Sequence, residues 1–202
     1  MLLQGKKAII TGGTRGIGFS VAEVFLKNGA SVALFGSRQE TVDKALAQLK
    51  AENPAWEVIG MAPDLTDYAA LDAAFSEVEN RFGRIDILVN NAGISAREPL
   101  YEYTPEAFQR IMDLNVTAVF NGCRAAAIRM KAQGGGSIIN TSSMVSLYGQ
   151  PSGVGYPTSK FAVNGMTRSL ARELGRDNIR VNAVAPGVTP VSYTHLTLPT
   201  IL

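Results

Sequence analysis

The sequence predicts an α/β fold in which a doubly wound parallel sheet lies between two layers of helices. Short apolar runs, rich in β-branched residues, alternate along the chain with longer helical patterns. Most of these runs are apolar on both faces, as expected for strands that helices cover on both sides. The first run leads directly into a glycine-rich turn that opens a helix. Together these observations predict a three-layer αβα architecture.

Six strands are expected, at residues 7–11, 31–36, 57–63, 85–90, 136–142 and 179–186. The helices between them are expected to end near Lys27, to span 40–51, to end near Arg81, and to span 105–131 and 155–174. Asn28-Gly29 is typical of a helix C-terminus. Thr104-Pro105 is typical of an N-cap followed by the first helical position. The end of the first helix and the start of the helix at 105 therefore each have a local signal in the sequence.

Composition limits the kinds of function to consider. The chain has 202 residues, is 46% hydrophobic and 18% charged, and carries a net charge of +2 with both signs scattered. These values predict one globular domain without a nucleic-acid or membrane surface. The single Cys123 excludes an internal disulfide and indicates a reducing cytoplasm. With one cysteine and one histidine, we expect no metal site.

The turn at residues 11–18, TGGTRGIG, is a candidate phosphate site. It follows a strand and opens a helix, whose N–H groups and positive dipole end suit a pyrophosphate. Gly12, Gly16 and Gly18 allow the tight turn, close approach of the phosphates and close packing of the helix on the strand. A tight turn without a ligand is the alternative, because the spacing is not the commoner GxGxxG.

The end of the second strand indicates which nicotinamide cofactor would bind. An NAD site usually has an Asp or Glu about 20 residues after the turn. Here Ser37 and Arg38 occupy that place, and Arg15 lies in the turn itself. Guanidinium groups without a carboxylate favour the 2′-phosphate of NADP, unless both arginines are merely solvated. Asp64 is expected either to accept from the adenine amino group or to cap the next helix.

Three polar side chains form a candidate proton-transfer site. Tyr156 and Lys160 are four residues apart on one helix, so their side chains lie on the same face. An ammonium group near a phenol favours the phenolate, which makes the tyrosine a better proton donor or acceptor near neutral pH. Ser143, at the end of the fifth strand, can hydrogen-bond a substrate oxygen, although Ser142 and Ser146 compete with it on chemistry alone. A solvated helix face is the alternative interpretation.

The order of these motifs resembles the classical short-chain dehydrogenase/reductase family from about residue 5 to residue 189. The matching motifs are the glycine pattern of 11–18, NNAG at 90–93, Asn115, Ser143, the Tyr156–Lys160 pair, and Pro186-Gly187. The resemblance implies a Rossmann-like fold and hydride transfer between a nicotinamide and a carbonyl or secondary alcohol. It selects Ser143 among the serines.

The resemblance also implies roles for individual residues. Tyr156 would protonate the carbonyl oxygen, Lys160 would also hold the nicotinamide ribose, and Asn115 would order a water that feeds protons to the lysine. The expected catalytic residues are Ser143, Tyr156, Lys160 and Asn115. The expected cofactor-binding residues are Gly12, Thr14, Arg15, Gly16, Ile17, Gly18, Ser37, Arg38, Asp64, Leu65, Asn91, Ala92, Gly93, Tyr156, Lys160, Pro186 and Gly187.

The substrate is left open by the sequence. A 3-oxoacyl-acyl-carrier-protein reductase is the first expectation, and a hydroxysteroid, sugar or other small-alcohol dehydrogenase is the alternative. Ser95, Met144, Tyr148 and Gln150 are candidate pocket residues, and Arg97 and Arg129 are candidate contacts of a carrier protein. A non-catalytic nucleotide binder is a further alternative. By resemblance, the two long helices would form a dimer interface.

The last residues depart from the family pattern. Residues 191–202 contain no Asp, Glu, Lys, Arg or Gly, whereas family members continue with a substrate-covering loop, a helix and a seventh strand. We therefore expect a single domain over residues 1–190, followed by a tail that is foreign to the fold, and we expect the usual last strand to be missing. The sixth strand would then be an exposed edge, a tetramer would be doubtful, and the chain could be an inactive fragment.

Overall fold

The computed structural model describes residues 1–189, and the expectations about residues 191–202 lie outside this range. The strands are β1 (Lys7–Thr11), β2 (Ser31–Phe35), β3 (Val58–Met61), β4 (Ile87–Asn90), β5 (Gly136–Thr141) and β6 (Ile179–Val184). The helices are α1 (Gly16–Lys27), α2 (Gln39–Glu52), α3 (Tyr68–Phe82), α4 (Pro105–Met112), α5 (Ala118–Ala132), α6 (Val145–Tyr148) and α7 (Gly155–Leu174).

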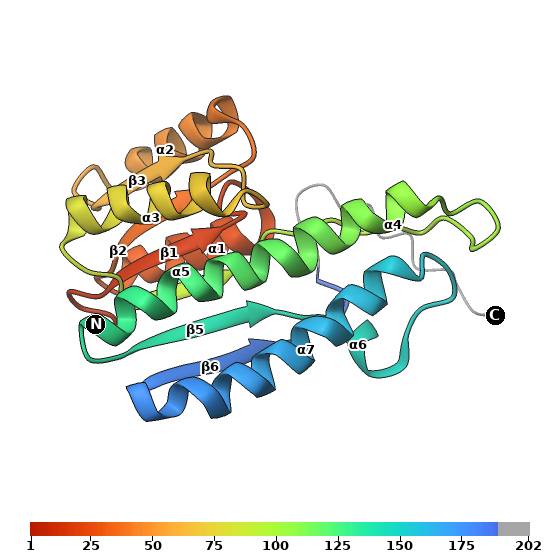
Figure 1. Ribbon diagram of the computed structural model, residues 1–202. Coiled ribbons are helices and arrows are strands. Elements are labelled where there is room, and N and C mark those ends of the chain that lie inside the picture. Colours follow the sequence, from red (N-terminus) through yellow and green to blue (C-terminus); the bar gives the residue numbers. More distant parts are fainter. Residues whose placement is uncertain (190–202) are drawn as a thin grey trace.

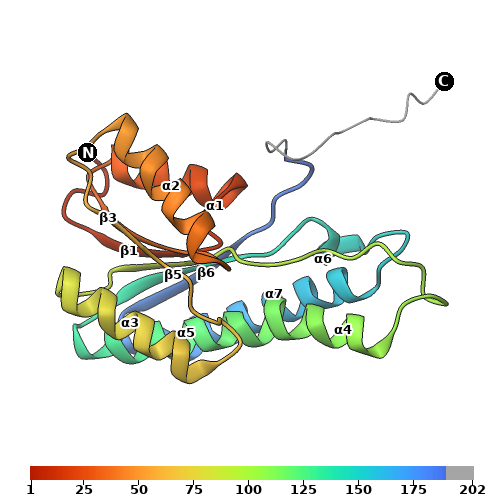
Figure 2. The same ribbon diagram turned by 90° about the horizontal axis from the view of Figure 1, so that it is seen from above.

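The described strands form one parallel sheet in the order β3-β2-β1-β4-β5-β6. Figure 1 shows β5 and β6 side by side with α7 running along them. Seen along the sheet in Figure 2, α1 and α2 lie on one face, while α3, α5 and α7 lie on the other. The chain reverses its direction of winding between β1 and β4, which creates a crevice at the carboxyl ends of these strands. This confirms the predicted Rossmann-like fold.

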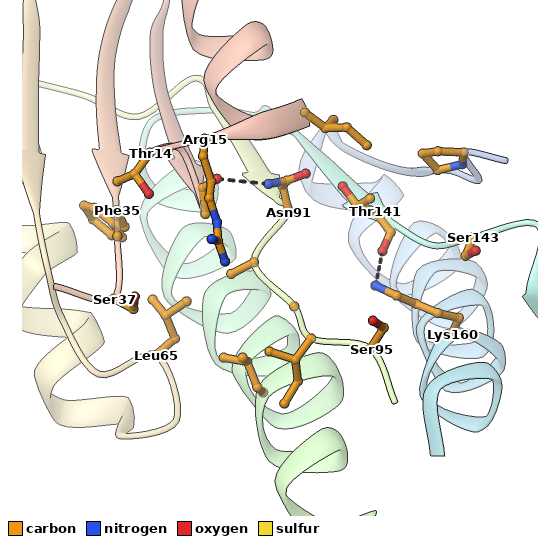
Figure 3. Close-up of a pocket in the computed structure, with 18 of the residues that line it drawn as sticks. Thr14, Arg15, Phe35, Ser37, Leu65, Asn91, Ser95, Thr141, Ser143 and Lys160 are labelled. Carbon is orange, nitrogen blue, oxygen red and sulfur yellow. Dashed lines mark hydrogen bonds between the residues drawn. The ribbon is translucent and has the colours of Figure 1, made fainter. Parts of the chain in front are cut away.

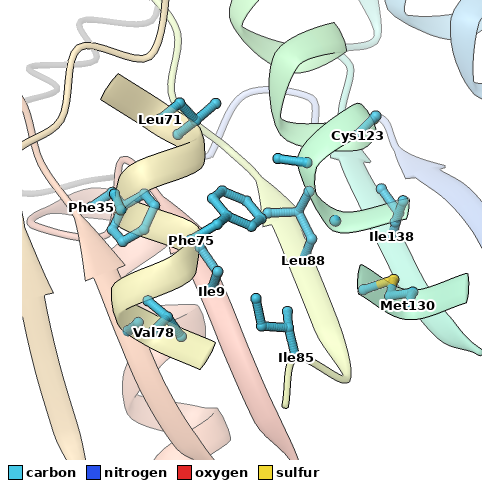
Figure 4. Close-up of a cluster of buried hydrophobic side chains, with 14 of the residues drawn as sticks. Ile9, Phe35, Leu71, Phe75, Val78, Ile85, Leu88, Cys123, Met130 and Ile138 are labelled. Carbon is cyan, nitrogen blue, oxygen red and sulfur yellow. The ribbon is translucent and has the colours of Figure 1, made fainter. Parts of the chain in front are cut away.

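Two apolar clusters hold the layers together. On the α3, α5 and α7 face, Phe35 and Phe75 meet edge to face at 5.9 Å. Leu71 and Leu88 lie beside this pair, and the same cluster continues to Ile138 (Figure 4). On the α1 and α2 face, alternate residues of the same strands pack against these two helices. Because β1, β2 and β4 contribute side chains to both clusters, their backbones are rigid supports for whatever lies at their ends.

The sixth strand differs from the prediction that its apolar residues are covered on both faces. Ile179 and Val181 are buried against the helices, whereas Arg180, Asn182 and Val184 are exposed. The apolar cluster beneath α1 and α2 includes side chains of β1, β2, β3 and β4 but none of β6, because these two helices lie over the other end of the sheet (Figure 2). In the described residues β6 is also an edge strand.

The predicted long helix over residues 105–131 is interrupted. A π-helical turn, Asp113–Thr117, separates α4 from α5 and turns Asn115 into the interior. The predicted caps are confirmed: the Thr104 side chain accepts from the N–H of Ala107, Pro105 opens α4, and Asn28 closes α1. The short helix α6 was not predicted, because four residues are too few for a periodic pattern.

Candidate active site

A cleft of about 720 Å³ lies across the carboxyl ends of the central strands (Figure 3). Most of the residues predicted to bind a cofactor line it together with Ser143. These are Gly12, Thr14, Arg15, Ile17, Ser37, Asp64, Leu65, Asn91, Ala92, Gly93, Tyr156, Lys160, Pro186 and Gly187. Segments far apart in the sequence therefore meet at one place, as the strand order requires.

The glycine-rich turn has a backbone that only glycine adopts readily. Gly12 and Gly16 have φ angles of 65° and 55°. A Cβ atom on Gly18 would lie 2.2 Å from the main-chain oxygen of Gly12, so α1 can approach the turn only with glycine there. Gly16 and Gly18 are not among the residues that line the cleft. Their role in the structure is to set the turn and the packing of α1.

The start of α1 suits an anion. Its N-cap residue, Arg15, does not cap the helix with its own side chain, and the first turn holds no acidic residue. The N–H groups of a helix start need acceptors, and a phosphate supplies them. Figure 3 shows the Arg15 side chain extending into the cleft, where a positive charge adds to the helix dipole. These features fit the pyrophosphate of a dinucleotide.

Asn91 ties the end of β4 to the glycine-rich turn. Its side-chain nitrogen donates to the main-chain oxygens of Thr11 and Gly12, both at 3.2 Å. The Thr11 hydroxyl accepts in return from the N–H groups of Asn91 and Ala92, at 3.0 and 3.1 Å. Thr11 is therefore a structural contributor that the prediction missed, although a hydroxyl directly before the glycines was visible in the sequence.

The residues expected to distinguish NADP from NAD lie around the far end of the cleft. Ser37 lines it, whereas Arg38 is exposed at the N-cap of α2 and is not among the lining residues. Asp64 lines the cleft and accepts from the Thr66 N–H and hydroxyl, and these bonds lower the pKa of its carboxyl. Asp67, not Asp64, caps α3, so the alternative of a capping role for Asp64 is wrong.

Tyr156 and Lys160 lie together near the end of β5. The amine of Lys160 is 5.7 Å from the centre of the Tyr156 ring and donates to the main-chain oxygen of Thr141 at 2.8 Å (Figure 3). Lys160 is only 4% exposed, and burial lowers its pKa to about 8 from its ordinary value of 10.5. Tyr156 is half-buried and lines the cleft. The pair can therefore hold and move a proton beside a bound ligand.

The three neighbouring serines have different surroundings. The hydroxyls of Ser142 and Ser146 bond to each other at 3.1 Å, and Ser146 also accepts from Asn164 at 2.8 Å. The Ser143 hydroxyl lines the cleft and accepts only a long bond, 3.4 Å, from the N–H of Val145. Ser143 thus has the hydroxyl most available to a substrate oxygen, and the geometry favours the same serine as the family motif.

Asn115 lies behind the cleft wall and not in it. Its side-chain oxygen accepts from the N–H of Ile94 at 2.9 Å, and its nitrogen donates to the Ile94 oxygen at 2.8 Å and to Ser159 Oγ at 3.0 Å. Asn115 is completely buried. Any part it takes in proton transfer must therefore be indirect, through the groups that it holds.

The predicted substrate contacts divide into two groups. Ser95 lines the cleft, and Met144, Leu147 and Tyr148 leave an apolar surface of exposed side chains immediately after Ser143. Gln150 instead donates to the main-chain oxygens of Ala96 and Gly153, where it joins two loops.

The predicted carrier-protein contact at Arg129 is not available to a partner. Its guanidinium group bonds to Asp72 at 2.7 Å, to Glu79 at 3.3 Å and to the Ser76 hydroxyl, and the side chain is 10% exposed. Arg97 is exposed in a loop. Among residues 1–189, no three His, Cys, Asp or Glu side chains gather as metal ligands. No helix in that range is long and apolar enough to cross a membrane.

A glycine-turn helix start, a cleft at the switch point of a parallel sheet and a Tyr–Lys pair within it define a dinucleotide-dependent α/β enzyme. The sequence profile of the short chain dehydrogenase family matches residues 6–198. The chain belongs to this family and is an oxidoreductase of alcohols and carbonyls that uses a nicotinamide cofactor. The match runs past residue 190, where we expected the family pattern to end.

The chain is similar to several dehydrogenases and reductases of known type. A 3α-hydroxysteroid dehydrogenase of Mediterraneibacter gnavus is 65% identical over 189 residues, covering 94% of this chain and 76% of the relative. A 3-oxoacyl-acyl-carrier-protein reductase of Chlamydia muridarum is 35% identical over 193 residues, covering 96% and 77%. The structure of NAD⁺-bound xylitol dehydrogenase matches with a TM-score of 0.89 and 34% identity, over 93% of this chain and 72% of that one.

Proposed function

We propose that this protein interconverts the 3α-hydroxyl and 3-oxo groups of steroids. The observation that carries the proposal is its 65% identity to a 3α-hydroxysteroid dehydrogenase, against 35% to a 3-oxoacyl-acyl-carrier-protein reductase. The first expectation from the sequence, an acyl-carrier-protein reductase, is therefore the less supported one. The engaged Arg129 removes one cation that an acidic carrier would need, and the apolar side chains beside Ser143 suit a steroid.

In this proposal Tyr156 is the acid and base of the reaction. When bound, the nicotinamide supplies or accepts the hydride. Tyr156 gives its phenolic proton to the carbonyl oxygen in reduction and takes it back in oxidation. Lys160, held by Thr141, keeps a positive charge beside the phenol and stabilises the phenolate. Ser143 donates to the substrate oxygen and steadies the charge that develops on it.

The cofactor we propose is NADP(H) in preference to NAD(H). Ser37 and Arg38 follow β2 where an NAD site would carry a carboxylate. Arg15, in the glycine-rich turn, lines the same cleft as Ser37. Arg38 does not line the cleft, but it is exposed next to Ser37, and its long side chain would reach a 2′-phosphate from there.

We further propose that residues 1–190 act as a single domain and that the protein forms a dimer through α5 and α7. Phe120 and Ile128 on α5 and Phe161 on α7 are each about half exposed, at 49%, 52% and 50%. Apolar side chains of this size on neighbouring helices favour burial against a second copy. Phe161→Glu should then give a monomer in sedimentation, whereas the wild-type chain sediments as a dimer.

A substrate comparison tests the proposed activity. The purified chain would be given a 3α-hydroxysteroid and its 3β epimer with NADP⁺ or NAD⁺, and a 3-oxoacyl thioester with NADPH, while nicotinamide absorbance is followed. We expect kcat/KM for the 3α alcohol to exceed that for the epimer and for the thioester by at least about tenfold. Faster turnover of the thioester would overturn the steroid assignment and leave the family assignment in place.

A further inference from the structure

Ser159 is a completely buried hydroxyl in the first turns of α7, directly before Lys160. Its hydroxyl donates to the main-chain oxygen of Tyr156 at 2.7 Å. The Ser159 hydroxyl oxygen in turn accepts from the side-chain nitrogen of Asn115 at 3.0 Å. Ser159 does not line the cleft, so it does not touch a ligand there.

The bond to Tyr156 alone would be ordinary, because serines inside helices often bond back to a preceding carbonyl. The second bond is different, since it comes from the π-helical turn and crosses between two elements. The hydroxyl hydrogen is directed at Tyr156, so only its lone pairs remain to receive the Asn115 N–H. A chain of donors thus runs in one direction from Asn115 through Ser159 to the backbone of Tyr156.

The other side of Asn115 fixes the position of this chain. Its amide is held by both the N–H and the carbonyl of Ile94, which follows Gly93 in the cleft wall. A Cβ atom on Gly93 would lie 3.0 Å from Asn115 Oδ1 and 3.7 Å from Lys160 Nζ. The side chains of Asn115 and Lys160 therefore both lie beside Gly93. A shift of Asn115 would for this reason also disturb the position of the Lys160 amine.

We infer that Ser159 is a positioning residue, which locks the Tyr156–Lys160 turn of α7 to the π-helical turn at Asn115. The inference rests on the proposed role of Tyr156 and Lys160 in proton transfer. Misplacement of a catalytic group by a fraction of an ångström lowers the rate of the chemical step more than it lowers binding. Loss of the Ser159 hydroxyl should therefore lower kcat and leave KM and nucleotide affinity nearly unchanged.

Two variants of equal shape separate the hydroxyl from its volume. Ser159→Thr keeps the hydroxyl and adds a methyl group, whereas Ser159→Val has the same outline without the hydroxyl. We expect Ser159→Val to show a kcat lower than that of Ser159→Thr by about tenfold, with KM for the alcohol and Kd for NADPH within about twofold. Thermal melts of both variants would show that each is folded.

A double-mutant cycle tests whether Ser159 acts through Asn115. If it does, the double variant Ser159→Ala/Asn115→Ala should lose no more kcat than Asn115→Ala alone, to within about twofold. The inference would be overturned if the losses of kcat in the two single variants multiply in the double variant. Equal kcat values for Ser159→Thr and Ser159→Val would overturn it as well. If Ser159→Thr or Ser159→Val fails to fold, kcat of Ser159→Ala is compared with kcat of Ser159→Cys at equal nucleotide occupancy. Equal values would again overturn the inference.

Failure of the proposed function gives a different result. Tyr156→Phe would then retain turnover, or the wild-type chain would not turn over the 3α alcohol at all, and the role of Ser159 would fall with it. A different result would reject only the inference about Ser159. In that case the wild type is active, Tyr156→Phe is inactive, and the position-159 variants have equal kcat values.

Discussion

The amine of Lys160 donates a hydrogen bond of 2.8 Å to the main-chain oxygen of Thr141, the last residue of β5. This single bond anchors a cation that is only 4% exposed. Burial lowers the pKa of Lys160 to about 8, so the protein holds a charged group at a cost in free energy. The buried ammonium group therefore costs stability at neutral pH, which fits the proposed role of Lys160 in proton transfer.

Lys160→Met should therefore stabilise the fold at neutral pH while it removes activity. The lowered pKa of Lys160 corresponds to a loss of about 3 kcal/mol in the wild type's free energy of unfolding at pH 7, which the variant avoids. The lost hydrogen bond to Thr141 offsets about 1 kcal/mol of this gain. We expect a net increase of about 2 kcal/mol in the free energy of unfolding, measured with urea at pH 7.

The pH dependence of that difference checks its cause. The folded wild type releases the Lys160 proton near pH 8, whereas the unfolded chain keeps it until about 10.5. The unfolded state thus binds more protons in this window, and wild-type stability rises with pH there relative to Lys160→Met. The difference in the free energy of unfolding between Lys160→Met and the wild type should therefore shrink as the pH rises from about 8 to 10.5. A difference that stays constant with pH would contradict a buried charge as its origin.

Gly18→Ala should weaken nucleotide binding and destabilise the turn. The new Cβ would lie 2.2 Å from the Gly12 oxygen and 2.5 Å from the Asn91 side-chain nitrogen, so either α1 or the turn must move. We expect Kd for NADPH, measured by fluorescence titration, to rise by at least about tenfold. Gly175→Ala is the control, because a Cβ there meets no atom within 4 Å and its φ is helical, at −56°. Unchanged affinity in Gly18→Ala would contradict the assignment of the turn.

Arg38→Ala should discriminate between the two nicotinamide cofactors. If the guanidinium binds the 2′-phosphate, the variant loses about tenfold in NADPH affinity, since a hydrogen bond to a charged group is worth about 1.5–3 kcal/mol. NADH affinity should stay the same. Arg176→Ala, an exposed arginine after α7, controls for net charge. Equal loss for both cofactors, or no loss, would remove the basis for preferring NADP(H).

Asn140→Ala should break a buried amide ladder that supports the sheet centre. Asn140 is the register partner of Asn90 across β4 and β5, accepts from it at 2.9 Å, and donates to the Thr167 hydroxyl at 3.0 Å. All three residues are buried, so the Asn90 amide, the Thr167 hydroxyl and the Cys123 thiol would each lose a partner. We expect a loss of about 2–4 kcal/mol in urea unfolding, non-additive with Asn90→Ala. Additive losses would show that the two amides act separately.

Much of the fold and of the candidate site could be predicted from local sequence. The alternation of strands and helices predicted a parallel sheet between two layers of helices. The glycine spacing and the Tyr156–Lys160 pair predicted residues that line the cleft. These features depend on short-range geometry, which a motif records directly. Ser143 needed a motif to be chosen, and the hydrogen bonds of Ser142 and Ser146 supply the physical reason.

Other features depend on contacts that the sequence does not record. The π-helical turn at 113–117 exists together with the two bonds from Asn115 to Ile94, which lies on a different segment. Periodicity predicts a continuous helix there, because it cannot detect a side chain drawn inward by a distant backbone. Arg129 and Gln150 were misread for the same reason: their partners, Asp72 and the Ala96 carbonyl, are more than fifty residues away in the chain.

The most direct test of the central claim is the single turnover of a 3α-hydroxysteroid by Tyr156→Phe, with nucleotide affinity measured on the same sample. Tyr101→Phe, at a fully exposed tyrosine, is the matched control. The account predicts a rate of hydride transfer lower by about 10²–10⁴-fold in Tyr156→Phe, with Kd for NADPH unchanged, and a control equal to wild type. Turnover by Tyr156→Phe at the wild-type rate would contradict it.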